Sequence, residues 1–247
     1  MSKLAETAAV SGADLVLFPE AAMVGGRPDQ SLVPFAERLD GAFVGELQRM
    51  AARHRVAIVA GMFEPAEPSR VYNTVVAVSQ DGRLIGSYRK IHLYDAFGHK
   101  ESDRIAPGDG QTLLFDLGGM RLGVMTCYEV RFPEVARRLA ELGAEALLLP
   151  AAWARGPLKE LHWETLARAR AIENTVYVAA AGQVSATLTG LSAIYDPMGV
   201  AIVNAGESEG VVIGEVRRER LDEVRRINPS LAMRRPDVYA AWQLVRT

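Results

Sequence analysis

The sequence predicts an α/β or α+β fold in which sheets and helices pack as layers of a sandwich. Short apolar runs bounded by Gly, Pro and Asp recur roughly ten times, and a few longer segments between them carry apolar residues on one helical face. The chain has 247 residues, of which 49% are hydrophobic, which is enough to bury one large core. Residues 1–247 are therefore predicted to form a single domain.

In the N-terminal half, a helical pattern ends at Ser11-Gly12, and a second one places Phe43, Leu47 and Met50 on one face. Asp81-Gly82 separates two apolar runs and is a strong hairpin signal. The elements expected in this half are helices at 3–10 and 41–54 and strands at 15–18, 56–61, 73–79 and 84–89.

The C-terminal half of the sequence also alternates between predicted strands and predicted helices. Gly118-Gly119 separates two strands, and a turn at Asp196-Pro197-Met198-Gly199 separates two more. The elements expected here are helices at 133–142 and 158–173 and strands at 113–116, 121–126, 146–150, 177–181, 191–195, 200–203 and 210–216. From Arg217 the sequence is charged and then aromatic, without a clear period.

Composition narrows the classes of function. The net charge of −2 gives no basic surface for nucleic acid or an anionic membrane, so neither is an expected partner. The apolar runs are too short to cross a bilayer, and the first residues have no apolar leader segment. One cysteine cannot form an internal disulfide or a multi-cysteine metal site. We expect a cytoplasmic protein that needs no metal and no cofactor.

Three potentially reactive side chains follow predicted strands. Glu20 comes after strand 15–18, Lys90 after strand 84–89 and Cys127 after strand 121–126. Open α/β sheets carry their chemistry at the carboxyl ends of strands. Singly, such a glutamate or lysine is usually solvated, and a lone cysteine is usually a small buried residue.

The position of Cys127 favours reactivity. A helix is expected to begin at Pro133, and the N–H groups near a helix start should favour the thiolate of a nearby cysteine. The polar neighbours of Cys127 also argue against a purely structural role.

These residues, taken in order, resemble the signature of the carbon-nitrogen hydrolase (nitrilase) superfamily. The similar segments are Leu17-Phe18-Pro19-Glu20, Tyr88-Arg89-Lys90-Ile91-His92-Leu93 and Thr126-Cys127-Tyr128-Glu129-Val130-Arg131-Phe132-Pro133-Glu134. The segment from His162 to Asn174 and the turn Asp196-Pro197-x-Gly199 are similar to the Nit-type amidase branch. The resemblance runs from about Lys3 to the end of the chain and implies a four-layer αββα sandwich with two central sheets.

The resemblance also implies the roles of the residues. It assigns Cys127 as the nucleophile, Glu20 as the general base and Lys90 as the cation that stabilises the tetrahedral oxyanion. Chemistry supports this division, because an amide is a poor electrophile and needs both an activated thiol and a fixed donor for the developing charge. Glu101 would orient Lys90 or the substrate, and the backbone N–H of Tyr128 could be a second oxyanion donor.

Substrate binding is assigned to Arg131, Tyr128 and Trp153. Arg131 stands four residues beyond the nucleophile. Two interpretations are open for it: a bidentate clamp on a substrate carboxylate, or a salt bridge to a nearby acid such as Glu134.

The chain departs from the family pattern at its start, because it reaches Glu20 almost at once. The resemblance therefore implies that the usual N-terminal strand is lacking, which would leave a sheet edge unpaired. Family members pair through helices near the active site, so we expect a homodimer or larger homo-oligomer, to which the tail around Tyr239 and Trp242 could add.

The predicted activity is cysteine-dependent hydrolysis of a small carboxylate-bearing amide, of the ω-amidase or deaminated-glutathione amidase type. Ammonia or an amine would leave through a thioester intermediate. Cys127-Tyr128-Glu129 resembles amidases more than nitrile-hydrolysing members, which tend to have tryptophan after the cysteine. The alternatives are an N-carbamoyl amidohydrolase or a catalytically weak scaffold of the same fold. A papain-like protease is disfavoured, because nothing around the histidines resembles its signatures.

Overall fold

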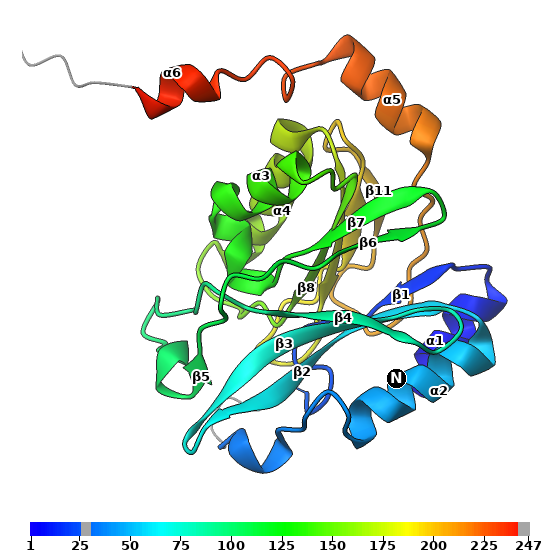
Figure 1. The fold of residues 1–247 in the computed structure, drawn as a ribbon, viewed down its shortest axis with the longest axis vertical. Helices are drawn as coiled ribbons and strands as arrows, with labels where there is room; N and C mark the ends of the chain where they lie inside the picture. The colour runs from blue at the N-terminus through cyan, green and yellow to red at the C-terminus, as the bar shows by residue number, and fades with distance from the viewer. Residues whose placement is uncertain (26–30, 242–247) are drawn as a thin grey trace, which may run out of the picture.

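The computed structural model describes residues 1–25 and 31–241, and two sheets lie face to face at its centre (Figure 1). In the first sheet the order is β1-β2-β3-β4, with β5 beside β3. Strand β1 is parallel to β2, whereas β2, β3 and β4 are antiparallel. The strands are β1 (Leu15–Leu17), β2 (Ala57–Glu67), β3 (Arg70–Val78), β4 (Leu84–Arg89) and β5 (Ile105–Ala106).

The second sheet has the order β11-β10-β9-β8-β7-β6. Its central strands β7, β8 and β9 are parallel, and the outer strands are antiparallel to their neighbours. The strands are β6 (Leu114–Leu117), β7 (Met120–Val124), β8 (Ala146–Ala151), β9 (Tyr177–Gly182), β10 (Ala193–Tyr195) and β11 (Ala201–Asn204).

Two pairs of helices cover the outer faces of the sheets and complete the four-layer αββα sandwich. Helices α1 (Ser2–Val10) and α2 (Ala42–His54) pack on the first sheet, and α3 (Pro133–Glu141) and α4 (Lys159–Asn174) pack on the second (Figure 1). The predicted fold class and these four helices are confirmed.

Side-chain alternation along the strands explains the layers. In β3, Val76 and Val78 pack toward α2, whereas Val75 and Ala77 pack toward the second sheet. Strand β8 does the same, with Leu148 between the sheets and Leu147 in the core under α3 and α4. Successive side chains of a strand point to opposite faces, so a wholly apolar strand can serve two cores at once.

One predicted strand is wrong. Residues 210–216 are not part of either sheet. A segment becomes a strand only when its backbone forms hydrogen bonds with a neighbouring strand. The β-branched residues of this segment favour an extended backbone but do not provide a neighbouring strand. The segment lines a cavity of about 730 Å³ together with β1 and the inner faces of β7 to β9. Among residues 1–25 and 31–241, strand β1 pairs with β2 alone.

The C-terminal part contains two helices that the sequence pattern did not predict, α5 (Arg218–Ile227) and α6 (Pro236–Ala240). Helix α5 buries only Leu221 and Val224, so its apolar stripe is too narrow to stand out in the sequence. In Figure 1, α6 extends away from the sandwich. Trp242 lies outside the described residues.

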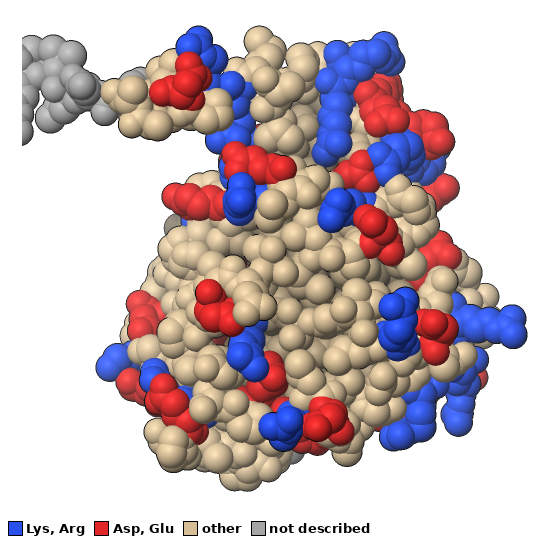
Figure 2. All heavy atoms as spheres, viewed as in Figure 1, with Lys and Arg blue, Asp and Glu red and all other residues tan. Residues whose placement is uncertain are grey.

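The surface is mixed in charge. Figure 2 shows positive and negative side chains next to each other around the rim of one face and few of either over its middle. That face has no continuous basic track of the kind that nucleic-acid binding uses. Within residues 1–25 and 31–241, no helix is both long enough and apolar enough to cross a bilayer.

Candidate active site

Glu20, Lys90 and Cys127 meet between the two sheets. Glu20 follows β1 and Lys90 follows β4 in the first sheet, while Cys127 follows β7 in the second. All three are buried, with 5%, 2% and 7% of their surfaces exposed. Lys90 and Cys127 lie 70 and 107 residues after Glu20 in the sequence. The strand order therefore brings together three residues that are far apart in the chain.

The turn that carries Cys127 is strained and capped. Cys127 begins the short 3₁₀ helix η3 (Cys127–Arg131) and has φ +48°, in the left-handed region that non-glycine residues rarely adopt. A Glu129 carboxylate oxygen accepts a hydrogen bond of 2.7 Å from the backbone N–H of Thr126. This bond fixes the backbone of the residue before Cys127.

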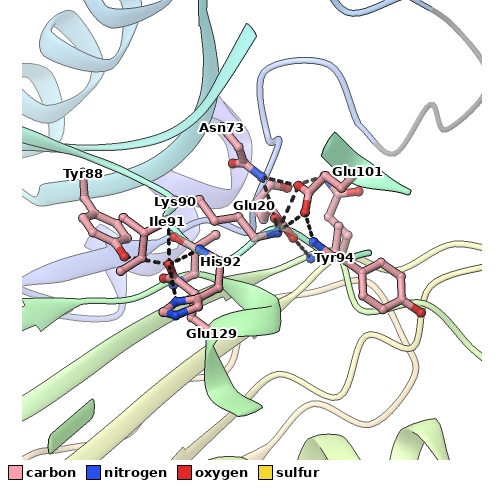
Figure 3. A network of polar contacts seen from close by, with 12 residues as sticks. Glu20, Asn73, Tyr88, Lys90, Ile91, His92, Tyr94, Glu101 and Glu129 are labelled. Atoms are coloured by element: carbon pink, nitrogen blue, oxygen red, sulfur yellow. Dashed lines mark hydrogen bonds and ion pairs between the residues drawn. The ribbon is translucent and has the colours of Figure 1, made fainter. Parts of the chain in front are cut away.

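The other oxygen of Glu129 joins this turn to the strand that leads to Lys90. It accepts hydrogen bonds from the Tyr88 hydroxyl at 2.7 Å and the backbone N–H of Ile91 at 2.9 Å (Figure 3). Glu129 is fully buried, so these bonds replace the water it loses. It therefore sets the position of the turn at Cys127 relative to the strand that leads to Lys90.

The Glu20 carboxylate accepts hydrogen bonds from three directions. One oxygen lies 3.0 Å from the Lys90 ammonium and 2.7 Å from the Asn73 side-chain nitrogen. The other accepts a bond of 2.7 Å from the backbone N–H of Ala152. Burial pulls the pKa of Glu20 upward, but the Lys90 charge and a hydrogen bond from the Cys127 thiol outweigh it, so this pKa lies below its ordinary value of 4.5.

Lys90 is held by a second carboxylate, that of Glu101 at the start of η2 (Glu101–Asp103). The ammonium lies 3.0 and 2.9 Å from the two Glu101 oxygens (Figure 3). Burial disfavours the charged amine, but the two carboxylates outweigh burial and hold the pKa of Lys90 well above its ordinary value of 10.5. The ammonium is thus a permanent, fixed cation beside the thiol.

The electrostatics of Cys127 correct one expectation. Burial and the negative charge of Glu20 raise the pKa of the thiol well above its ordinary value of 9.0, and Lys90 offsets this only in part. The free protein therefore holds a neutral thiol and an ionised carboxylate, not a preformed thiolate.

Arg131 lies on an aromatic surface near the thiol. Its guanidinium carbon is 4.9 Å from the ring centre of Trp153 and 5.8 Å from that of Tyr128, and one of its nitrogens lies 3.3 Å from His162 Nδ1. The structure thus brings together the three residues assigned to substrate binding. Within the described part of the chain, no salt bridge joins Arg131 to Glu134, which was the alternative interpretation.

Three features of the site were not predicted from the sequence: Asn73, the positioning role of Glu129, and Lys159. Asn73 shares the inner face of β3 with Val75 and Ala77, so a polar residue in phase with apolar ones was the available signal. Lys159 is 4% exposed and contacts the Trp153 ring, as Arg131 does. A lysine at the first position of a helix, where the dipole disfavours a cation, was its only signal.

Comparison with known proteins identifies the family to which the chain is similar. The model of the carbon-nitrogen hydrolase family matches residues 1–226. A deaminated glutathione amidase of Escherichia coli O157:H7 is 42% identical over 95% of this chain and 89% of its own length. An omega-amidase of Homo sapiens is 32% identical over 94% of this chain and 87% of its own length.

A solved structure shares the fold. It is a variant of the amidase from Nesterenkonia sp. AN1 in which acrylamide is attached to the active-site cysteine. It has a TM-score of 0.83 and 26% identity, and it covers 98% of this chain and 91% of the other.

Proposed function

The chain belongs to the carbon-nitrogen hydrolase family, as an enzyme of the amidase kind, and we propose that it hydrolyses a small amide bearing a carboxylate. The reaction would be that of an ω-amidase or deaminated-glutathione amidase. The observation that carries this proposal is Arg131, a cation without a carboxylate partner among the described residues, four positions beyond Cys127. The names of the relatives support it.

The first half of the proposed reaction forms a thioester. Glu20, ionised at rest, takes the proton of the Cys127 thiol as sulfur bonds to the amide carbon. The carbonyl oxygen becomes an oxyanion, which the Lys90 ammonium and a backbone N–H stabilise. Glu20 then gives its proton to the nitrogen, the C–N bond breaks, and ammonia or an amine leaves.

The second half regenerates the enzyme. Glu20 takes a proton from a water molecule, and the hydroxide adds to the thioester carbon. The C–S bond breaks, the sulfur recovers the proton from Glu20, and the product leaves as a carboxylic acid that loses its own proton to water. Both proton relays pass through the Glu20 carboxylate, whose orientation is fixed by Asn73 and the Ala152 N–H.

A substrate panel tests the proposal against its alternatives. Ammonia release would be measured with 2-oxoglutaramate, deaminated glutathione, N-carbamoyl amino acids and simple nitriles. The proposal requires the first two to be the best substrates. A clear preference for the carbamoyl compounds would favour an N-carbamoyl amidohydrolase, and no release from any of them would favour the scaffold alternative.

The pKa directions predict the pH dependence. Glu20 must be ionised to act, and its pKa is below 4.5, so activity is lost only as the pH falls through that low value. We expect the acid limb of the kcat/KM profile to lie below pH 4.5, with a plateau across neutral pH. Circular dichroism at each pH separates titration from unfolding. An acid limb near pH 6 in the folded protein would contradict Glu20 as the base.

The carboxylate clamp predicts the effect of Arg131→Ala. Loss of a charge-assisted hydrogen bond costs about 1.5–3 kcal/mol, or roughly a tenfold to hundredfold loss in kcat/KM with carboxylate amides. Arg131→Lys should recover part of this, because an ammonium lacks the planar fork. Arg138→Ala, at an exposed arginine of α3, is the matched control. Equal losses with charged and neutral amides would refute the clamp.

The proposal also includes the oligomeric state of the protein and its location in the cell. A homodimer or larger homo-oligomer is supported by the family resemblance and by Tyr239 in α6, which is 45% exposed. A cytoplasmic location is supported by the single cysteine, which must stay reduced to react. Light scattering at micromolar concentration should give a mass above that of one chain, and a strictly monomeric mass would contradict the assembly.

A further inference from the structure

A second cation, Lys159, shares the aromatic surface of Arg131. The Lys159 ammonium lies 4.7 Å from the ring centre of Trp153 and 4.5 Å from that of Phe97. The Arg131 guanidinium lies 4.9 and 5.4 Å from the same two rings. Two positive side chains from different elements, η3 and the start of α4, are thus held against one set of rings.

No carboxylate balances this pair in the part of the chain that the structure describes. The polar contact of Lys159 is the Tyr94 hydroxyl at 3.0 Å, and that of Arg131 is His162. The Nε atom of Arg131 is buried without a hydrogen-bond partner among the described residues. Lys159 is buried and Arg131 is partly buried. Buried cations are normally paired, so the uncompensated positive charge of this site favours an anionic ligand.

Three features of its position oppose the charge of Lys159. Lys159 is 4% exposed and stands at the first position of α4, where the helix dipole opposes a cation. Burial, followed by the charge of Arg131, lowers its pKa. Aromatic faces offset part of this cost, but they do not neutralise the charge. A bound anion would remove the repulsion between the two cations.

The pair is connected to the catalytic residues. The backbone N–H of Tyr94 donates to Glu101 at 2.5 Å, while its hydroxyl contacts Lys159. Figure 3 shows the ring of Tyr94 pointing away from the network around Lys90. The Trp153 indole donates to the backbone carbonyl of Lys159 at 2.8 Å, which fixes the start of α4 beside the rings. Tyr94 therefore links Glu101, the carboxylate that holds Lys90, to Lys159.

We propose that Lys159 is a specificity-determining residue that binds the substrate carboxylate together with Arg131 and rejects amides with an ammonium group at that end. This inference rests on the proposed function. The guanidinium can bind the carboxylate as a planar fork, and the ammonium can approach as a point charge from α4. A substrate ammonium would be repelled by two cations held against aromatic rings, of which Lys159 is buried.

The test compares three amides that differ in charge at the far end: 2-oxoglutaramate, glutamine and neutral butyramide. For Lys159→Met we expect kcat/KM with 2-oxoglutaramate to fall about tenfold to hundredfold, chiefly through KM. With butyramide the change should stay below about threefold, since only a charge-assisted contact is lost. The preference for 2-oxoglutaramate over glutamine should shrink.

Two further variants control for structural effects. Lys159→Arg keeps the charge and should recover part of the loss, whereas Lys3→Met, at an exposed lysine of α1, should change nothing. An equal loss with butyramide would show that Lys159 only supports the aromatic wall, and it would overturn the proposal. An unchanged KM for 2-oxoglutaramate would overturn it as well.

A binding measurement separates this inference from the proposed function. Calorimetric titration of the parent and of Lys159→Met with 2-oxoglutarate, a dicarboxylate that needs no turnover, should show weaker binding by a similar factor in the variant. Equal binding by the two proteins would refute the role of Lys159. If the parent binds 2-oxoglutarate through Lys159 but hydrolyses none of the amides, the inference stands and the proposed function fails.

Discussion

Cys127→Ala should abolish turnover, with a loss on the order of 10⁴–10⁶ in kcat, while the protein keeps its fold. The thiol is the atom to which the acyl group becomes attached in the proposed reaction, and nothing else at the site can replace it. The substitution removes one buried sulfur and keeps a Cβ, so the strain at φ +48° is unchanged. The fold should therefore lose little stability.

Mass spectrometry after acid quenching checks this assignment. The parent should carry an acyl adduct on the peptide that contains Cys127, and Cys127→Ala should carry none. Cys127→Ser is the second variant, because its hydroxyl fits the site but gives up its proton far less readily than a thiol. The same acyl adduct on Cys127→Ala, or near-parental turnover by either variant, would contradict the role of the cysteine.

Local patterns sufficed for most of the fold and failed where an element depends on a distant partner. The apolar runs of β3 and β8 are a local property of the sequence. The Asp81-Gly82 turn sets the register of β3 and β4. Residues 210–216 have the composition of a strand but no neighbour to pair with. Helix α5, in contrast, forms although its sequence pattern is weak, because it packs through only two buried residues.

The same distinction applies to the site. Glu20, Lys90 and Cys127 could be found because each follows an apolar strand and because the family resemblance selects them. The contacts of Asn73 with Glu20 and Glu101 join residues 53 and 28 positions apart, which no local pattern encodes. The neutral state of the Cys127 thiol also depends on burial and on the nearby Glu20 charge, which exist only in the folded protein.

Lys90→Met should lower kcat by about 10²–10³, the usual effect of removing one donor to an oxyanion. It should also change the pH profile. The Lys90 charge lowers the pKa of Glu20, so its loss lets that pKa rise, and the acid limb of kcat/KM should move to higher pH. This shift reports the Lys90 charge beside Glu20, whereas the fall in kcat reports the loss of the oxyanion donor.

Folding of the variant needs its own control, because the substitution leaves Glu20 and Glu101 buried without their shared cation. Removing one partner of a buried ion pair costs about 3–5 kcal/mol of stability. The double variant Lys90→Met/Glu101→Gln removes one of the two carboxylate charges, so it should recover thermal stability without recovering activity. If the double variant is folded and turns over amides at a near-parental rate, Lys90 does not stabilise the oxyanion. If it is folded, turns over at a strongly reduced rate and has an acid limb shifted upward, the ammonium acts on both the oxyanion and the base.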